Sequence, residues 1–290
     1  MGTASSSHAV MQQGTPVFDA VLLFREALYG ALVIGIACSV IGVYVVLRRI
    51  VFVGAALAEL SSAGIALALW LEGQSMMLGL ATHPIALALI LTIAGALFFG
   101  AGGGRGRIPP DATVGVTYAV AGAAGILLIS KAAVGEAHDI FLAGNILGIT
   151  RTDTLVLMAV AVPVLIIHTV FYKEFLFVSF DRETARTLGY NINVWNLLLY
   201  FTLGVVIAFA MQSAGVMLVF NFLVLPAVTG LLVSRSMSGV FLWSVISALV
   251  ASLIGFTLSV RYDLPTSPAI IAVSGALVLV AFLARLGQRR

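Results

Sequence analysis

One carboxylate stands alone inside an apolar stretch of this sequence. The run from Phe52 to Leu71 reads FVGAALAELSSAGIALALWL, and Glu59 is its only charged residue. An ionised carboxylate at membrane depth is costly unless a partner compensates its charge, so such a residue marks an ion or proton path by default. The competing interpretation is structural, with Glu59 protonated or directed toward the nearer membrane surface. Glu59 is therefore the first candidate for a cation-binding side chain.

Further polar side chains are candidates for the same path or for its outer entrance. Ser62 lies close to Glu59 in the sequence, although a helical Ser more often bonds to its own backbone. Asn221 lies in another apolar run, where a broken helix would expose it to a central path; amides in membrane helices more often hydrogen-bond between helices. His138 and Asp139 lie in a connecting loop, where they would meet an external partner or guide a metal inward, or simply be solvated.

The composition restricts the class of protein. Of 290 residues, 61% are hydrophobic and 9% are charged, which is typical of polytopic membrane proteins. A net charge of +3 is too small to suggest a nucleic-acid partner. Residues 1–19 are polar and do not form a signal peptide, so we expect a disordered tail followed by one transmembrane domain over residues 20–290. Cys38 is the single cysteine, which excludes an intrachain disulfide.

Apolar runs of spanning length recur along the chain. A membrane helix needs about 20 such residues, and the runs cover residues 20–47, 52–71, 83–100, 112–131, 153–172, 193–211, 214–235, 238–260 and 266–285. The seventh run contains Pro226, which removes a backbone hydrogen bond and is expected to break the helix there. We predict an all-α polytopic membrane protein with about nine transmembrane helices, or eight if the second or seventh run is re-entrant.

The basic residues orient these spans. If the N-terminus is outside, eleven of the fifteen Lys and Arg residues lie in cytoplasmic segments. The cytoplasmic set is Arg48, Arg49, Arg105, Arg107, Lys173, Arg182, Arg186, Arg235, Arg285, Arg289 and Arg290; the external set is Arg25, Lys131, Arg151 and Arg261. The positive-inside rule therefore predicts an external N-terminus and a cytoplasmic C-terminus.

Two cytoplasmic segments have distinct compositions. Residues 100–111, GAGGGRGRIPPD, lack the Gly-Lys-Ser/Thr ending of a phosphate-binding loop and are expected to form a flexible linker. The segment 172–193 contains a short predicted helix that Asp181 caps and Gly189 ends, with Glu183 and Arg186 on adjacent turns. This helix is either an ordinary surface helix or a docking site for a cytoplasmic partner.

Five stretches, in chain order, carry a family resemblance. They read GVYVVLRRIVFVGAALAELSSAGIALAL (42–69), FLAGNILGIT (141–150), SFDRETARTLGYN (179–191), MQSAGVMLVFNFLVLPAVTGLLVS (211–234) and YDLPTSPAII (262–271). Together they resemble the membrane permease subunit of ATP-binding-cassette importers for zinc, manganese and iron. The resemblance covers most of the chain from about Phe24 to Leu286.

The resemblance implies a working assembly. Two permease copies would form a dimer in a bacterial-type plasma membrane, with cytoplasmic ATPase subunits and an external solute-binding protein. The chain itself would be no enzyme, because ATP hydrolysis would reside in the ATPase partner. No permanently bound cofactor is implied; the cargo would be a divalent transition-metal ion, Zn²⁺ first, with Mn²⁺ or Fe²⁺ as alternatives. Residues 181–189 would be the coupling helix that docks into the ATPase.

The sequence departs from the family at the expected metal site. Family members typically carry Gly-Asp-x-x-x-His in the second span, and an i, i+4 pair shares one helix face. Here Gly54 is kept, but Ala55 takes the Asp position and Glu59 takes the His position. Two Glu59 carboxylates converging across a dimer axis would still bind a divalent ion, and carboxylates suit Mn²⁺ better than imidazole does.

Two alternatives remain open on sequence grounds. A permease for a metal chelate or siderophore would need a roomy path more than bare metal ligands, which would explain the missing Asp–His pair. An ion-coupled carrier would transport without any ATPase. An intramembrane hydrolase is disfavoured, because the sequence contains neither His-Glu-x-x-His nor Gly-x-Ser-x-Gly.

Overall fold

The computed structural model describes residues 24–73, 84–103, 108–131 and 146–287. Within these ranges every regular element is a helix. The long helices are α3 (Arg25–Leu47), α4 (Val51–Gly73), α5 (Pro84–Gly100), α6 (Pro110–Lys131), α8 (Arg151–Val170), α11 (Ile192–Val233), α12 (Met237–Tyr262) and α13 (Thr266–Gly287). The short ones are η2 (Ile146–Gly148), α9 (Tyr172–Phe180) and α10 (Arg182–Thr187). The predicted all-α class is confirmed.

Seven of these helices are long and apolar enough to cross a membrane, namely α3, α4, α6, α8, α11, α12 and α13. The apolar helix α5 is shorter, with 17 residues. In the described ranges each of the nine predicted runs overlaps one of these helices, and the sixth and seventh lie together on α11. The second run, suspected of being re-entrant, forms one continuous helix of 23 residues. The chain is a multi-pass membrane protein.

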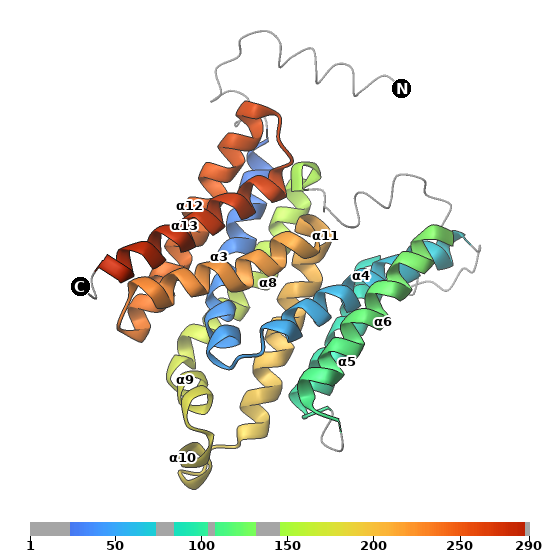
Figure 1. Cartoon of the computed structure of the whole chain (residues 1–290). Coiled ribbons are helices and arrows are strands. Elements are labelled where there is room, and N and C mark those ends of the chain that lie inside the picture. The colour runs from blue at the N-terminus through green and yellow to red at the C-terminus, as the bar shows by residue number, and fades with distance from the viewer. Residues whose placement is uncertain (1–23, 74–83, 104–107, 132–145, 288–290) are drawn as a thin grey trace.

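Helix α11 is too long for one straight crossing. Its 42 residues would extend about 63 Å at the usual helical rise, whereas the hydrocarbon core is about 30 Å thick. The helix breaks at Gly215, whose φ of 74° and ψ of 168° are not helical. The two parts consequently run in different directions (Figure 1). The expected break at Pro226 was wrong, because α11 continues through that residue.

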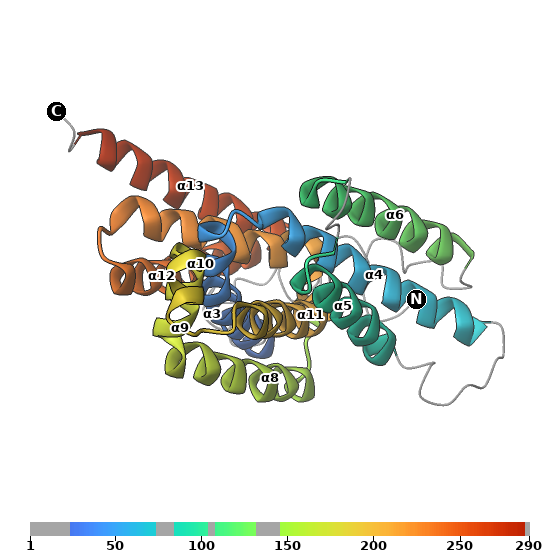
Figure 2. The same ribbon diagram turned by 90° about the horizontal axis from the view of Figure 1, so that it is seen from below.

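The helices form two groups that share α11. Helix α3 packs against α8, α11 and α12, and α13 packs against α11 and α12. Helix α4 packs against α5, α6 and α11. Helices α4, α5 and α6 lie together beside the rest of the bundle (Figures 1 and 2). Glu59 therefore lies in the group formed by α4, α5 and α6.

Glycines allow the closest helix crossings. A Cβ atom on Gly42 of α3 would overlap the backbone of Leu223 on α11, and one on Gly64 of α4 would lie 2.6 Å from the Cα atom of Ala88 on α5. Small residues at such crossings let the backbones of two membrane helices come into van der Waals contact. This packing matters because the hydrophobic effect does not drive helices together within a lipid bilayer. These contacts bring α3 close to α11 and α4 close to α5.

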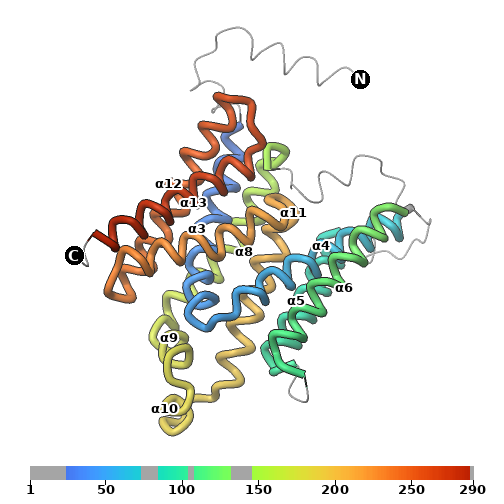
Figure 3. The backbone as a smooth tube through the Cα atoms, viewed as in Figure 1, coloured from blue at the N-terminus to red at the C-terminus, as the bar shows by residue number. Residues whose placement is uncertain are grey.

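The short helices α9 and α10 gather at one end of the molecule. The turn between α3 and α4, the end of α5, the start of α6 and the start of α11 lie toward the same end (Figure 3). This end carries Arg48, Arg49 and Arg182, so it is the end that the charge pattern predicts to be cytoplasmic.

Candidate functional site

Glu59 lies on α4 and faces α6. Its side chain is half-buried. A Cβ atom placed on Gly122 of α6 would lie 3.3 Å from Glu59 Oε2 and 3.5 Å from Cδ, so the carboxylate lies against the α6 backbone at a position without a side chain. The absence of a side chain at Gly122 leaves the room that the carboxyl group occupies.

The face that carries Glu59 also carries Ala55. Both residues are half-buried, whereas Ala56, Leu57 and Ala58 between them are at most 1% exposed. The i, i+4 relationship thus places both side chains on the same, partly accessible side of α4. These are the two positions at which the resemblance leads one to expect metal ligands, and of the two only Glu59 has a side chain that could bind an ion.

Two buried hydroxyl groups follow Glu59 on α4. Ser61 and Ser62 are at most 1% exposed, and neither Oγ atom has a hydrogen-bond partner. The usual bond from a helical Ser to its own backbone is therefore missing at both residues. A buried hydroxyl without a partner costs about 1–3 kcal/mol, so these groups are available to a water or an ion.

Asn221 belongs to a different helix contact. It lies on the second part of α11, where its Nδ2 donates to Ser274 Oγ of α13 at 3.2 Å. Its Oδ1 is buried and has no partner. The structure thus gives Asn221 an interhelical hydrogen bond directed at α13, while Glu59 faces α6.

The described part of the chain holds no group of three or more His, Cys, Asp or Glu side chains that could bind a metal. Glu59 therefore does not belong to a cluster of three or more such side chains in the described part of a single copy. A complete ion-binding site would need ligands from a second copy, from water or from backbone oxygens.

The predicted short helix after the fifth span is confirmed as α10. Asp181 caps it by accepting hydrogen bonds from Thr184 N at 2.9 Å and from Thr184 Oγ1. These bonds hold the pKa of the Asp181 carboxyl below its usual value. Gly189 ends the segment with a φ of +86°, a backbone conformation that favours glycine.

The segment presents an exposed surface. Glu183 and Arg186 are exposed on α10, and the apolar Phe180 and Leu188 at its two ends are 60% and 65% exposed. The only buried residue of α10 is Ala185. A short, capped helix with charged and apolar exposed groups has the features of a docking element.

The candidate residues of the external face, His138 and Asp139, lie outside the described residues, as does the tail 1–19. Their roles stay predictions.

A polar network around Arg48 was missed from the sequence. Arg48 follows α3, and its Nε donates to Ser179 Oγ at 2.8 Å while its Nη1 donates to Asn196 Oδ1 at 2.6 Å. These contacts join the α3–α4 turn to α9 and α11 across more than 130 residues of sequence. The only signal was the pair Arg48-Arg49 directly after an apolar run, which was read for topology alone.

His168, which has no ligand spacing in the sequence, also acquires a structural role. Its Nε2 lies 3.0 Å from Thr202 Oγ1 of α11, and its ring stacks on Phe175 with centroids 4.5 Å apart. The residue is 1% exposed. His168 therefore belongs to the contact between α8, α9 and α11.

Comparison with known proteins supports the resemblance. The family model described as ABC 3 transport family matches residues 21–285. The manganese import system permease protein ScaB of Streptococcus gordonii is 30% identical over 267 residues, covering 91% of this chain and 92% of that protein. The chelated iron transport system membrane protein YfeD of Yersinia pestis is 26% identical over 259 residues, covering 89% of this chain and 84% of YfeD.

A solved structure has the same fold. PsaBC from Streptococcus pneumoniae, determined in complex with Fab, superposes with a TM-score of 0.78 at 27% identity, covering 92% of this chain and 94% of that chain. The family model alone covers far more than half of the sequence. The chain therefore belongs to the ABC 3 transport family, as its resemblance to metal-importer permeases implied.

Proposed function

We propose that this permease carries a divalent transition-metal ion and that Glu59 contacts the ion on its path. The observation that supports this most directly is the position of Glu59, a half-buried carboxylate within an apolar helix, seated against the bare backbone of Gly122. The Ser62 hydroxyl, three residues further along the same helix, has no hydrogen-bond partner and is the second candidate oxygen. Uncompensated polar groups at membrane depth are costly and are typically functional.

The path is completed by a second copy of the chain. The described residues of one copy hold no cluster of three or more His, Cys, Asp or Glu side chains, whereas a divalent ion needs several ligands. Two Glu59 side chains, one from each copy, would balance the charge of one divalent ion. Asn221 is the further candidate ligand, through its unpartnered Oδ1.

Mn²⁺ is the best-supported cargo. Carboxylate and hydroxyl oxygens suit Mn²⁺ better than nitrogen ligands do, and ScaB is named a manganese permease. Zn²⁺, the first expectation from the sequence, accepts carboxylates but gains more from imidazole. The exchange of the family's His for Glu59 therefore favours the harder ion.

Transport is driven by separate ATPase subunits that dock on residues 181–189. This proposal is supported by the exposed Glu183 and Arg186 and by the fixed ends at Asp181 and Gly189. An external solute-binding protein delivers the metal to the opposite face, where His138 and Asp139 are the candidate contacts.

Selectivity is tested by measuring uptake of Mn²⁺, Zn²⁺ and Fe²⁺ in vesicles that contain the permease and its ATPase subunits. We expect ATP-dependent uptake with Mn²⁺ preferred, and a shift toward Zn²⁺ in the double variant Ala55→Asp with Glu59→His, which restores the family pair. ATP-independent uptake would contradict the proposal and indicate an ion-coupled carrier.

A metal chelate is the second candidate cargo, because YfeD is named a chelated-iron permease and the family's Asp–His pair is missing here. The same vesicles distinguish the two cargoes. Uptake of ferric siderophore without uptake of free Mn²⁺ would establish the chelate and reject the bare ion.

A further inference from the structure

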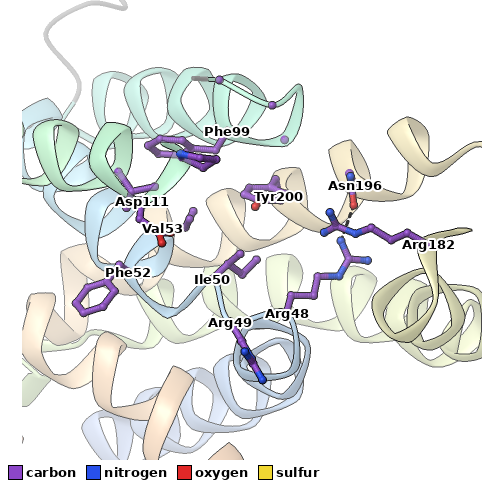
Figure 4. Close-up of a pocket in the computed structure, with 15 residues that line it drawn as sticks. Arg48, Arg49, Ile50, Phe52, Val53, Phe99, Asp111, Arg182, Asn196 and Tyr200 are labelled. Carbon is purple, nitrogen blue, oxygen red and sulfur yellow. Dashed lines mark hydrogen bonds between the residues drawn. The ribbon is translucent and has the colours of Figure 1, made fainter. Parts of the chain in front are cut away.

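A cavity of about 450 Å³ lies where several helices end near α10. Its walls come from the α3–α4 turn, the end of α5, the start of α6 and the first turns of α11 (Figure 4). Because these are the ends of candidate membrane helices, the cavity lies at the level of the membrane surface and not at its centre. The charge pattern predicts that this surface is cytoplasmic.

Arg48 is held firmly at the cavity wall. Its bonds to Ser179 and Asn196 fix two of its three guanidinium nitrogens. The third, Nη2, is buried and has no hydrogen-bond partner. The Arg48 guanidinium is therefore held in a fixed position, and the N–H groups of Nη2 have no hydrogen-bond acceptor.

Two further arginines, Arg49 and Arg182, line the same cavity. Figure 4 shows the Arg48 and Arg182 side chains meeting beside Asn196. Burial and the nearby charge of Arg182 lower the pKa of Arg48 to about 10, so Arg48 is still charged at neutral pH. Two like charges at one wall repel each other unless an anion lies between them.

Nearby carboxylates do not neutralise these arginines. Asp111 lines the cavity, and Asp181 and Glu183 line an adjoining hollow of about 440 Å³. Among the described residues the only ion pair joins Arg25 and Glu26 at the other end of α3. Asp181 is instead engaged by Thr184. The cavity thus retains an excess of positive charge.

The lining away from Arg48 and Arg182 is mainly apolar. It consists of Ile50, Val53, Phe99 and Val114 together with Asp111, and Phe52 is 75% exposed beside them (Figure 4). A carboxylate on a docked protein or a free inorganic anion would use the arginines but not this apolar wall. A ligand with an anionic head and a hydrocarbon tail would use both.

We propose that this cavity binds the phosphate headgroup of an anionic phospholipid of the cytoplasmic leaflet. The phosphate contacts the exposed Arg182, the fixed charge of Arg48 beside it adds to the attraction, and an acyl chain runs along the exposed face of Phe52. Basic pockets between membrane helices on the cytoplasmic side are suited to such headgroups. Because Arg182 is the first residue of α10, the bound lipid joins the α3–α4 turn to the coupling segment.

Native mass spectrometry of the purified full-length chain tests the proposal. The chain is titrated with phosphatidylglycerol and, separately, with phosphatidylcholine of the same acyl chains. We expect one phosphatidylglycerol per chain to bind about tenfold more tightly than phosphatidylcholine. Binding should be about five-fold weaker in Arg182→Gln or Arg49→Gln, since each arginine near anionic headgroups contributes about 1 kcal/mol, which corresponds to about five-fold in affinity. Arg235→Gln removes an exposed arginine outside the cavity and should bind as the native chain does.

Competition separates the sources of the phosphate. Millimolar inorganic phosphate should not displace the lipid, and Phe52→Ala should weaken lipid binding. Displacement by inorganic phosphate would show a plain anion site and overturn the proposal. Equal retention of both lipids, or equal losses in Arg182→Gln and Arg235→Gln, would overturn it as well. Loss of ATPase co-purification in Arg182→Gln with unchanged lipid binding would assign the cavity to the ATPase instead.

Discussion

The carboxylate of Glu59 on α4 lies against Gly122 on α6, so close that one added carbon on Gly122 would sit 3.3 Å from Oε2. The only charged residue of an apolar run thus lies against the neighbouring helix at a glycine, where no side chain separates it from the backbone. Helix α6 packs chiefly on α4, so the pairing of these two helices determines how Glu59 is presented.

Crowding Gly122 should impair transport. In Gly122→Val the added side chain would press on the Glu59 carboxyl group and displace it. Metal uptake should fall several-fold while the amount of protein in the membrane stays the same. Gly115→Val is the matched control on α6, because nothing lies within 4 Å of a Cβ atom there. Equal uptake in the two variants would show that the Glu59–Gly122 contact is unimportant.

Disturbing the coupling segment should uncouple the ATPase. Gly189→Val forces a β-branched residue into a φ of +86°, and Asp181→Lys removes the acceptor of the Thr184 bonds. Both should lower co-purification of the ATPase subunits and metal-stimulated ATP hydrolysis. Asp153→Lys is the control, since Asp153 belongs to the capping box of α8, at the end predicted to be external. Undiminished hydrolysis in both coupling variants would reject the docking role.

The cap at Asp181 also has a pH dependence. Its pKa is depressed in the folded chain by the bonds from Thr184. Because the pKa of this carboxyl is lower in the folded chain than in the unfolded chain, its ionised form stabilises the folded state. This stabilisation is fully present at pH values above the ordinary carboxyl pKa, near 4, and is lost as the pH falls through the lower pKa of the folded chain. ATPase docking should therefore be constant from pH 6 to pH 8 as far as Asp181 is concerned. A marked decline within that range, abolished by Asp181→Asn, would contradict this assignment.

Gly215 should be needed for the bend in α11. Its φ of 74° and ψ of 168° lie in a region that essentially only glycine occupies. Gly215→Ala should destabilise the folded chain by about 1–3 kcal/mol and lower its thermal unfolding temperature in detergent. Gly275→Ala on α13 is the control, because the nearest atom to its Cβ would be 4.0 Å away. A Gly215→Ala chain as stable as this control would show that the bend does not depend on glycine.

The orientation can be read from single cysteines. Cys38, the only native cysteine, is buried and should give no background labelling. A membrane-impermeant maleimide added outside intact cells should label Arg261→Cys and leave Thr187→Cys unlabelled until the membrane is opened. The reverse pattern would overturn the predicted N-out, C-in topology.

The sequence was most informative where the chemistry is local. Apolar length predicted the helices, and the Asp181 and Gly189 end signals predicted α10. Glu59 could be singled out because one charge in an apolar run is visible without any structure.

The contacts that depend on distant segments could not be predicted. The α11 break lies at Gly215 and not at Pro226, since a membrane helix tolerates proline when neighbouring groups satisfy the freed carbonyl. The Arg48 bonds cross more than 130 residues, and no local pattern specifies them. The contact of Glu59 with Gly122 likewise follows only from how α4 and α6 pack.

The central claim is that the charge of Glu59 lies on the metal path, and uptake by Glu59→Gln tests it most directly. Glu72→Gln is the matched control, because Glu72 is an exposed carboxylate at the end of the same helix. Radioactive Mn²⁺ uptake, measured with the ATPase subunits present and normalised to protein in the membrane, should fall about tenfold or more in Glu59→Gln, as expected for loss of a ligand. It should be unchanged in Glu72→Gln. Native rates in Glu59→Gln would contradict the account and make Glu59 a structural residue.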